Sequence, residues 1–291
     1  MSRTAACSFL ALSMLSGLVR ADEPKVLTDF DVVYTKVGDT ELKLDMARPA
    51  EGEGPFPGVV VIHGGAWRGG NKSDNRALLT SFAKRGYVAI SPQYRFCPKE
   101  TFPAQLYDVK ASVRWLRSHA KDYSLDSAHI GATGFSAGGH LALMLGVTGP
   151  DDKLEGDVAA DAPSSRVQAV VNYFGPTDMN ADDIPEVSRP LLKDFLGIAP
   201  KDDPKLAAQA SPISFVTKDD PPTLTFQGTK DPLVPHTQAF KLTDAQTVAG
   251  VPGRVELIVG GGHGNWGSAE IQRTIDSAMV FFDEHLKSKK K

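Results

Sequence analysis

The sequence places a serine, an aspartate and a histidine, the three residue types of a nucleophilic relay, in motifs that suit such chemistry. Ser136 lies in Gly-Phe-Ser-Ala-Gly, residues 134–138, between a predicted strand and a predicted helix. In that context Gly-x-Ser-x-Gly is typical of a nucleophile elbow, a tight turn that projects the serine hydroxyl clear of a sheet. The helix that follows directs its positive end at the same point. Ser136 is therefore the predicted nucleophile.

The acid of the relay is expected after a later strand. Asp231 lies in "QGTKDPLVP", 95 residues beyond Ser136, and Pro232 fixes the turn behind it. A carboxylate at this point could accept the Nδ1–H of a histidine and fix the tautomer of the ring. Asp178 in "GPTDM" follows the preceding predicted strand and is the alternative acid. Asp231 is favoured because Ser, Asp, His is a known chain order of such triads.

The predicted general base is His263, in "GGGHG" after the last predicted strand and 32 residues beyond Asp231. The glycines at 260–262 would let the backbone bend back over the sheet, and Gly264 is expected to leave room for substrate beside the ring. No Gly-x-Gly-x-x-G opens a helix in a βαβ unit here, which argues against a phosphate cradle.

A second glycine-rich loop, "HGGAW" at 63–67, follows the apolar run "VVVI". Acyl transfer needs backbone N–H donors where a carbonyl oxygen becomes an oxyanion. We expect Gly65 and Ala66 to donate from this loop and Ala137 to donate from the elbow. His63 is expected to hold the shape of the loop.

Three aromatic residues, Trp67, Phe174 and Trp266, adjoin these loops and are predicted to form a wall against a sugar or aryl group; plain packing is the alternative. Structural roles are expected for Asp108 with Arg95 as its ion-pair partner, for Cys97, and for His140, which lies four residues after Ser136.

The elements that must position these residues follow an α/β pattern. Alternating segments at 31–37 and 41–47 predict an antiparallel hairpin, whereas "GVVVI" at 58–62 is typical of a strand covered on both faces. Strands and helices then alternate, with helices expected at 74–85, 104–120, 136–147, 236–249 and 268–286. This order predicts a mostly parallel, doubly wound sheet with an N-terminal antiparallel hairpin. The segments 149–165 and 176–220 are expected to be excursions above the sheet, and 176–220 to be irregular.

The motifs resemble those of esterases of the α/β-hydrolase superfamily, most nearly the bifunctional feruloyl and acetyl xylan esterases, with kynurenine formamidases and hormone-sensitive-lipase-like esterases as cousins. The resemblance covers residues 30–286 and rests on "HGGAW", "GFSAGGHLAL", "NYFGPTD", "SPISFV", "GTKDPLVP" and "GGGHG". It implies Ser136 as nucleophile, His263 as base and Asp231 as its orienter. Ala66 stands where the lipase-like cousins carry a third glycine, which favours the xylan esterase or formamidase side.

The start of the chain is typical of a signal peptide. Arg3 precedes the apolar run "AACSFLALSMLSGLV", and small residues permit cleavage after Ala21. Removal of residues 1–21 would leave one catalytic domain, 22–291, and change the formal charge from −3 to −5, because Arg3 and Arg20 are lost. That mild charge argues against nucleic acid as a partner. We expect secretion or a periplasmic location, without stable membrane insertion after cleavage.

These observations predict a serine carboxylesterase that removes acetyl-type or feruloyl groups from carbohydrate without a metal or organic cofactor. The alternatives are a lipase-like or general carboxylesterase, a prolyl-type serine peptidase, and a non-catalytic binding protein with a hydrolase fold. A lipase is disfavoured because 176–220 is polar and rich in proline. A prolyl-type peptidase would normally carry a second domain. The oligomeric state is left open.

Overall fold

The computed structural model describes residues 24–288, so the predicted signal peptide lies outside the described residues. Its centre is an eight-stranded sheet of order β1-β2-β4-β3-β5-β6-β7-β8. The strands are β1 (Val26–Val37), β2 (Thr40–Pro49), β3 (Phe56–Ile62), β4 (Val88–Pro92), β5 (Leu125–Phe135), β6 (Ala169–Tyr173), β7 (Thr223–Gly228) and β8 (Gly253–Ile258). Strand β2 is antiparallel to both β1 and β4, and every other neighbouring pair is parallel. The predicted fold class is confirmed.

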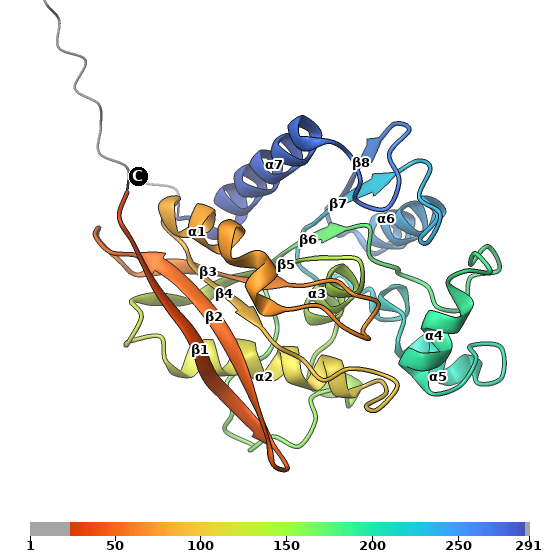
Figure 1. The fold of residues 1–291 in the computed structure, drawn as a ribbon, viewed down its shortest axis with the longest axis horizontal. Helices are drawn as coiled ribbons and strands as arrows, with labels where there is room; N and C mark the ends of the chain where they lie inside the picture. The colour runs from red at the N-terminus through yellow and green to blue at the C-terminus, as the bar shows by residue number, and fades with distance from the viewer. Residues whose placement is uncertain (1–23, 289–291) are drawn as a thin grey trace, which may run out of the picture.

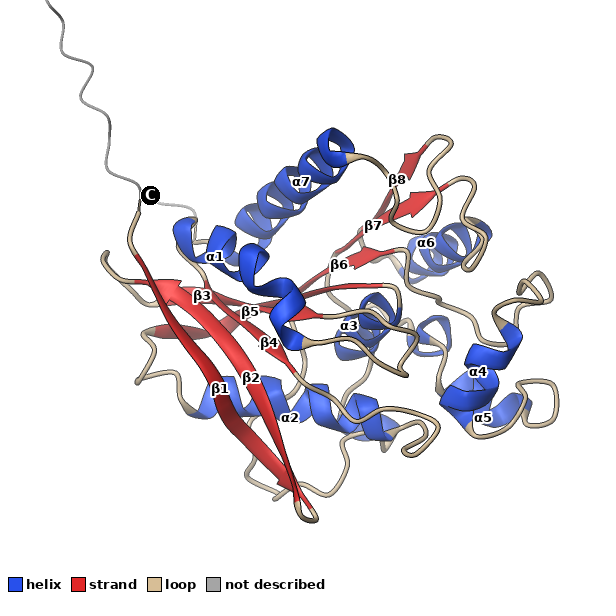
Figure 2. Ribbon diagram, viewed as in Figure 1, coloured by secondary structure: helices blue, strands red, loops and turns tan. Residues whose placement is uncertain are grey.

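Helices cover both faces of the sheet (Figures 1 and 2). They are α1 (Arg76–Lys84), α2 (Ala104–Ser118), α3 (Ala137–Val147), α4 (Arg189–Leu196), α5 (Pro204–Gln209), α6 (Thr237–Ala249) and α7 (Ser268–Leu286). Helices α2 and α3 pack in one apolar cluster and helices α1 and α7 in another, on the opposite face. Within residues 24–288, no helix combines the length and the apolarity that a membrane crossing requires.

The burial of individual strands explains their sequence patterns. Val60 and Ile62 of β3 belong to the cluster of α2 and α3, whereas Val59 and Val61 belong to the cluster of α1 and α7. A strand with both faces buried has no solvent side for polar residues, hence the continuous apolar run. In the hairpin strand β2, Leu42, Leu44 and Met46 alternate along one buried face, and on the other face Asp45 and Ala47 are buried while Glu41 and Lys43 are not.

The segment 176–220 is more ordered than predicted, because it contains α4, α5 and a 3₁₀ turn at Pro212–Phe215. Prolines stand at the first helical positions of α5 and of the 3₁₀ turn and at the second position of α4. A proline there costs no hydrogen bond and presets the backbone. The proline content that suggested irregular structure therefore marks helix starts.

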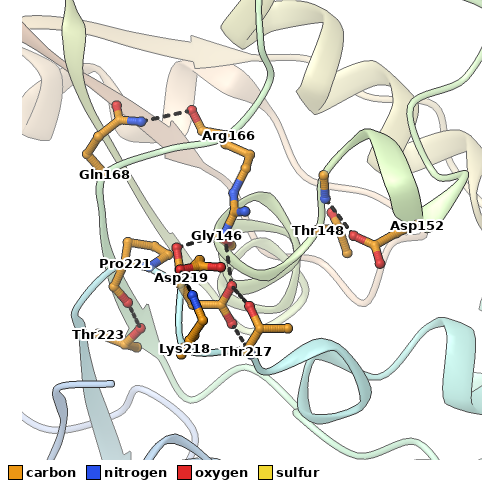
Figure 3. Close-up of polar contacts among 12 residues, drawn as sticks. Gly146, Thr148, Asp152, Arg166, Gln168, Thr217, Lys218, Asp219, Pro221 and Thr223 are labelled. Carbon is orange, nitrogen blue, oxygen red and sulfur yellow. Dashed lines mark hydrogen bonds and ion pairs between the residues drawn. The ribbon is translucent and has the colours of Figure 1, made fainter. Parts of the chain in front are cut away.

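The C-terminal end of the segment 176–220, just before β7, is held by the side chain of Arg166 (Figure 3). The Arg166 guanidinium donates to the Asp220 carboxylate at 2.9 Å, to the Asp219 carbonyl at 3.2 Å and to the Gly146 carbonyl near the end of α3 at 3.3 Å. Asp220 also accepts the backbone N–H of Thr217 at 2.9 Å. These bonds hold the residues that lead into β7, the strand that carries the predicted acid.

Candidate active site

Ser136 lies between the end of β5 and the start of α3 in a backbone conformation that few residues adopt. Its φ is +55° and its ψ is −117°, a strained combination for a residue with a Cβ atom. The turn requires glycine on both sides. A Cβ atom at Gly134 would lie 2.4 Å from backbone atoms of Gly138, and one at Gly138 would lie 2.1 Å from the Ile62 carbonyl oxygen. The Gly-x-Ser-x-Gly spacing is thus imposed by sterics.

The three predicted relay residues are brought together by three separate loops. His263 Nε2 lies 2.8 Å from Ser136 Oγ, and His263 Nδ1 lies 2.7 Å from Asp231 Oδ2. Asp231 follows β7 and His263 follows β8, two strands that pair in parallel with Gly228 opposite Ile258. Because parallel strands end at one edge of a sheet, residues 32 apart in the sequence meet there. The geometry matches that of a nucleophile, a base and an orienting acid.

The carboxylate of Asp231 is fully supplied with hydrogen-bond donors. Its side chain is 0% exposed. Oδ1 accepts the backbone N–H groups of Leu233 at 2.8 Å and Val234 at 2.9 Å, and Oδ2 accepts Gln227 Nε2 at 3.2 Å in addition to the His263 ring. A buried charge is tolerated when its lone pairs are satisfied in this way. Four donors hold the carboxylate in one orientation toward His263.

The loop that begins at His63 lies directly against the elbow. A Cβ atom at Gly64 would be 2.8 Å from the Phe135 carbonyl oxygen, and one at Gly65, where φ is +116°, would be 2.2 Å from the Gly69 carbonyl oxygen. Among the described residues, no acceptor receives the N–H groups of Gly65 and Ala66. Ala137 opens α3, so its N–H has no partner within the helix. The three predicted oxyanion donors are therefore available for a ligand.

Ser136 and His263 open onto a cavity of about 320 Å³. Gly65, Ala66 and Trp67 form part of its lining. The remaining walls are mostly apolar and come largely from the segment 176–192 and the loop after Asp231: Pro176, Met179, Ile184, Pro185, Leu191, Leu192, Leu233, Val234 and Pro235. Sequence reasoning missed this wall because the polar, proline-rich composition of the segment masked the short helical pattern of Leu191, Leu192, Phe195 and Leu196.

The three predicted wall aromatics are separated by the structure. Trp67 lines the cavity, but Phe174 and Trp266 do not. Phe174 packs on the His263 ring with 4.7 Å between centroids, and Trp266 meets Phe174 edge-on at 5.2 Å. Phe174 thus supports the His263 ring, and Trp266 supports Phe174. The space beside Gly264 is also filled, since a Cβ atom there would lie 2.9 Å from the Phe174 ring, so it offers no room for substrate.

The other predicted residues take structural positions. Asp178 lines the cavity and lies 3.7 Å from Lys241 Nζ, with no contact to His263. His63 is buried, bonds to the Gly64 carbonyl at 2.8 Å and stacks on Tyr94. The expected ion pair of Arg95 with Asp108 is confirmed at 2.9 Å.

The lone described cysteine, Cys97, is buried, and burial raises the pKa of its thiol to about 11. Such a thiol is protonated at neutral pH and is a poor nucleophile. Its structural assignment agrees with this environment.

The sequence model of the BD-FAE family matches residues 44–245, more than half of the chain. The chain belongs to the BD-FAE family. Esterase LipQ of Mycobacterium tuberculosis is similar to this BD-FAE chain, with 35% identity over 198 residues that cover 67% of the chain and 46% of LipQ. The BD-FAE chain spans about half the length of the curated relatives it matches first. The predicted resemblance to α/β-hydrolase esterases is confirmed.

Solved structures similar to this BD-FAE chain are also esterases. A truncated carbohydrate esterase from gut microbiota superposes with a TM-score of 0.79 at 29% identity, and the match covers 92% of this chain and 99% of that one. A thermophilic esterase from the Planctomycetes species Thermogutta terrifontis, Est2 with propionate bound, gives a TM-score of 0.74 at 26% identity, covering 92% and 97%. Est2 has also been solved phosphorylated by paraoxon.

Proposed function

We propose that this BD-FAE protein is a serine carboxylesterase that hydrolyses small acyl esters, acetyl-type or feruloyl, of carbohydrate. The observation that carries the proposal is the continuous hydrogen-bonded chain from Ser136 through His263 to Asp231, opening onto a cavity with unpaired backbone donors. Together these features provide a nucleophile, a base, an orienting acid and a site for an oxyanion.

In the proposed reaction Ser136 Oγ attacks the ester carbonyl carbon while His263 Nε2 takes the hydroxyl proton. The negative charge moves to the carbonyl oxygen, which accepts hydrogen bonds from the N–H groups of Gly65, Ala66 and Ala137. The tetrahedral intermediate then collapses, the C–O bond to the alcohol breaks, and His263 gives its proton to the alcohol. Water repeats the two steps on the acyl-serine and releases the acid. Asp231 stabilises the imidazolium throughout.

The residues that line the cavity indicate which part of the ester binds there. Its mostly apolar walls suit a hydrocarbon or aryl acyl chain, whereas a sugar would leave hydroxyl groups without partners there. We therefore place the acyl group in the cavity and the carbohydrate outside it. The carbohydrate esterase among the similar structures supports a carbohydrate as the alcohol of the ester. The signal-like start of the chain supports action outside the cytoplasm, after cleavage behind Ala21.

A general carboxylesterase acting on short aliphatic esters is the second candidate. The apolar wall around Leu191, Leu192 and Ile184 favours it as much as it favours a feruloyl group. The propionate-bound similar esterase adds support of the same kind.

The test of the mechanism is Ser136→Ala. We expect turnover of an aryl acetate to fall by about 10⁶ and labelling by a fluorophosphonate to disappear, with one equivalent of label on Ser136 in the parent protein. A parent protein that takes no label would favour the non-catalytic binding protein. Labelling that persists in Ser136→Ala would overturn the assignment of the nucleophile.

The test of the substrate is a panel of acetylated xylan, methyl ferulate, formylkynurenine and p-nitrophenyl esters of increasing chain length. Release of acetate from xylan or of ferulate from methyl ferulate is the expected result. Activity confined to p-nitrophenyl esters would favour the general carboxylesterase, and activity confined to long acyl chains would favour a lipase-like enzyme.

A further inference from the structure

His140 is a buried histidine outside the triad, and its ring joins three parts of the site. It lies on α3 one turn after the nucleophile, and its backbone N–H donates to the Ser136 carbonyl at 3.0 Å. The ring contacts Trp67 of the loop at 63–70. It also contacts Phe195 and Ala210, which belong to the segment 176–220.

The hydrogen bonds of the ring fix its protonation state. The Trp67 indole Nε1–H donates to His140 Nδ1 at 3.3 Å, and an indole nitrogen can only donate. Nδ1 is therefore unprotonated. The proton must lie on Nε2, which donates to the Ala210 carbonyl at 2.8 Å. The ring is 0% exposed, and burial lowers the pKa of His140 to about 4. A neutral ring with one fixed tautomer thus links Trp67 to Ala210.

The residues on the Trp67 side need such a link. Ala66 and Trp67 have φ values of +53° and +56°, in the left-handed region that residues with a Cβ atom rarely adopt. Each costs free energy that neighbouring contacts must offset. Besides the bond to His140, Trp67 stacks on Phe195 with 4.1 Å between centroids, and its carbonyl accepts the Cys97 N–H at 2.9 Å. These contacts hold the loop whose residues Gly65 and Ala66 line the cavity.

We propose that His140 is a positioning residue: by accepting the Trp67 indole N–H it holds Gly65 and Ala66 in place as oxyanion donors, and by donating to Ala210 it couples that loop to the segment that walls the cavity. The inference rests on the proposed function, because it assigns a part in the same reaction. His140 touches neither the substrate nor the reacting atoms, so its contribution passes through Trp67.

Two substitutions of His140 separate its two bonds. His140→Asn can place an amide oxygen where Nδ1 was and keep the acceptor for Trp67, while it loses the donor to Ala210. His140→Gln can place an amide nitrogen where Nε2 was and keep that donor, while it loses the acceptor. Trp67→Phe breaks the indole bond from the other side and keeps a ring against Phe195. Trp115→Phe, on α2 and stacked on His119, is the matched control for removing an indole.

The first readout is the second-order rate of Ser136 labelling by a fluorophosphonate, whose phosphoryl oxygen takes the place of the oxyanion. We expect His140→Gln and Trp67→Phe each to slow labelling by about tenfold. We expect His140→Asn, which keeps the acceptor for Trp67, to label faster than His140→Gln, and Trp115→Phe to stay within about threefold of the parent. The double variant His140→Gln with Trp67→Phe should be no slower than either single variant, because both remove the same bond.

The second readout is steady-state kinetics on an aryl ester, with inhibition by an aryl trifluoromethyl ketone whose hemiketal oxygen carries the developing charge. The proposal expects kcat to fall and the inhibition constant to rise by the same factor, with KM changed less than about twofold. Labelling rates of His140→Gln and Trp67→Phe equal to the parent rate would overturn the proposal. So would a change confined to KM, which indicates packing of the cavity wall.

Failure of the proposed function gives a different pattern. In that case the parent protein itself takes no label at Ser136, or Ser136→Ala still turns substrate over. Thermal unfolding midpoints identify any variant that is unstable. Labelling rates are then compared at a temperature well below the lowest of these midpoints.

Discussion

Two histidine–aspartate pairs in this protein share one hydrogen-bond length and differ in their surroundings. His263 Nδ1 lies 2.7 Å from Asp231 Oδ2, and His129 Nδ1 lies 2.7 Å from Asp126 Oδ2. The Asp231 side chain is 0% exposed and that of Asp126 is 27% exposed. Ser136 Oγ stands at the second nitrogen of His263, whereas no described residue bonds to the second nitrogen of His129.

A short His–Asp distance does not by itself make a catalytic base. An exposed pair contributes little because water competes for both partners. A buried carboxylate cannot turn to water, so it fixes the tautomer of the ring and directs Nε2 at one target. In the first pair that target is a serine hydroxyl on a strained turn. The predictions below change one feature of this contrast at a time.

The largest effect is expected from removing the charge of each carboxylate. Asp231→Asn should lower kcat for an aryl ester by about 10⁴, because the amide favours the wrong tautomer of His263. Asp126→Asn, the matched control, should leave kcat within about twofold of the parent. Equal kcat values in the two variants at neutral pH would show that Asp231 is not the orienting acid.

Burial of a histidine should govern how stability depends on pH. Burial lowers the pKa of His140 to about 4, while an unfolded histidine titrates near ~6.5. Between these values only the unfolded chain binds the proton, so the free energy of unfolding should decrease as pH falls. The decrease from His140 is about 2 kcal/mol between pH ~6.5 and ~5.

Urea unfolding near pH ~7 and ~5 measures this decrease. His140→Asn should show a smaller decrease than the parent. The same pH dependence in the parent and in His140→Asn would contradict the prediction.

A smaller effect is expected from the donor that supports the buried pair. Gln227 Nε2 donates to Asp231 Oδ2 at 3.2 Å and to the Val234 carbonyl at 2.9 Å. Gln227→Met keeps the volume and removes both bonds, so kcat should fall about fivefold, in line with about 1 kcal/mol for one hydrogen bond. Burst kinetics with an aryl ester would assign the loss to acylation or deacylation. An unchanged kcat in a folded variant would show that the other three donors suffice.

The smallest effect is expected at the partly exposed pair of His129 and Asp126. His129→Gln removes its hydrogen bond to Asp126, yet the free energy of unfolding should change by less than about 1 kcal/mol, with kcat unchanged. Urea unfolding and aryl ester turnover check both quantities. A larger loss of stability would mean that partial exposure does not screen this pair.

Much of the fold and of the candidate site could be predicted from short motifs and from the order of the elements along the chain. Ser136, Asp231 and His263 were identified because a nucleophile elbow, a strand-end carboxylate and a glycine-flanked histidine each have a local signature, and all three meet in the structure. The hairpin strands at 31–37 and 41–47, the strand at 58–62 and the long helices agree with the structure to within about five residues at each end, because apolar residues in strands and helices recur with distinct periods.

The parts that escaped prediction depend on long-range contacts. The two short helices of 176–220 pack through Leu192, Phe195 and Ala207 into the apolar cluster of α2 and α3, and their prolines suggested loops instead. Phe174 and Trp266 were expected beside the substrate but pack behind His263, a difference decided by the path of the loop after β8. The link between Trp67 and His140 joins residues 73 positions apart, and neither residue alone suggests it.

The position of β8 at the edge of the sheet has a consequence for how the protein loses activity on heating. Ser136 follows β5, which has a neighbour on each side, but His263 follows β8, which pairs only with β7. Edge strands open at lower free energy than central ones. Detachment of β8 alone would leave the central strands intact and still remove the base. Loss of activity on mild heating would then report local fraying at one margin before the cooperative loss of the fold.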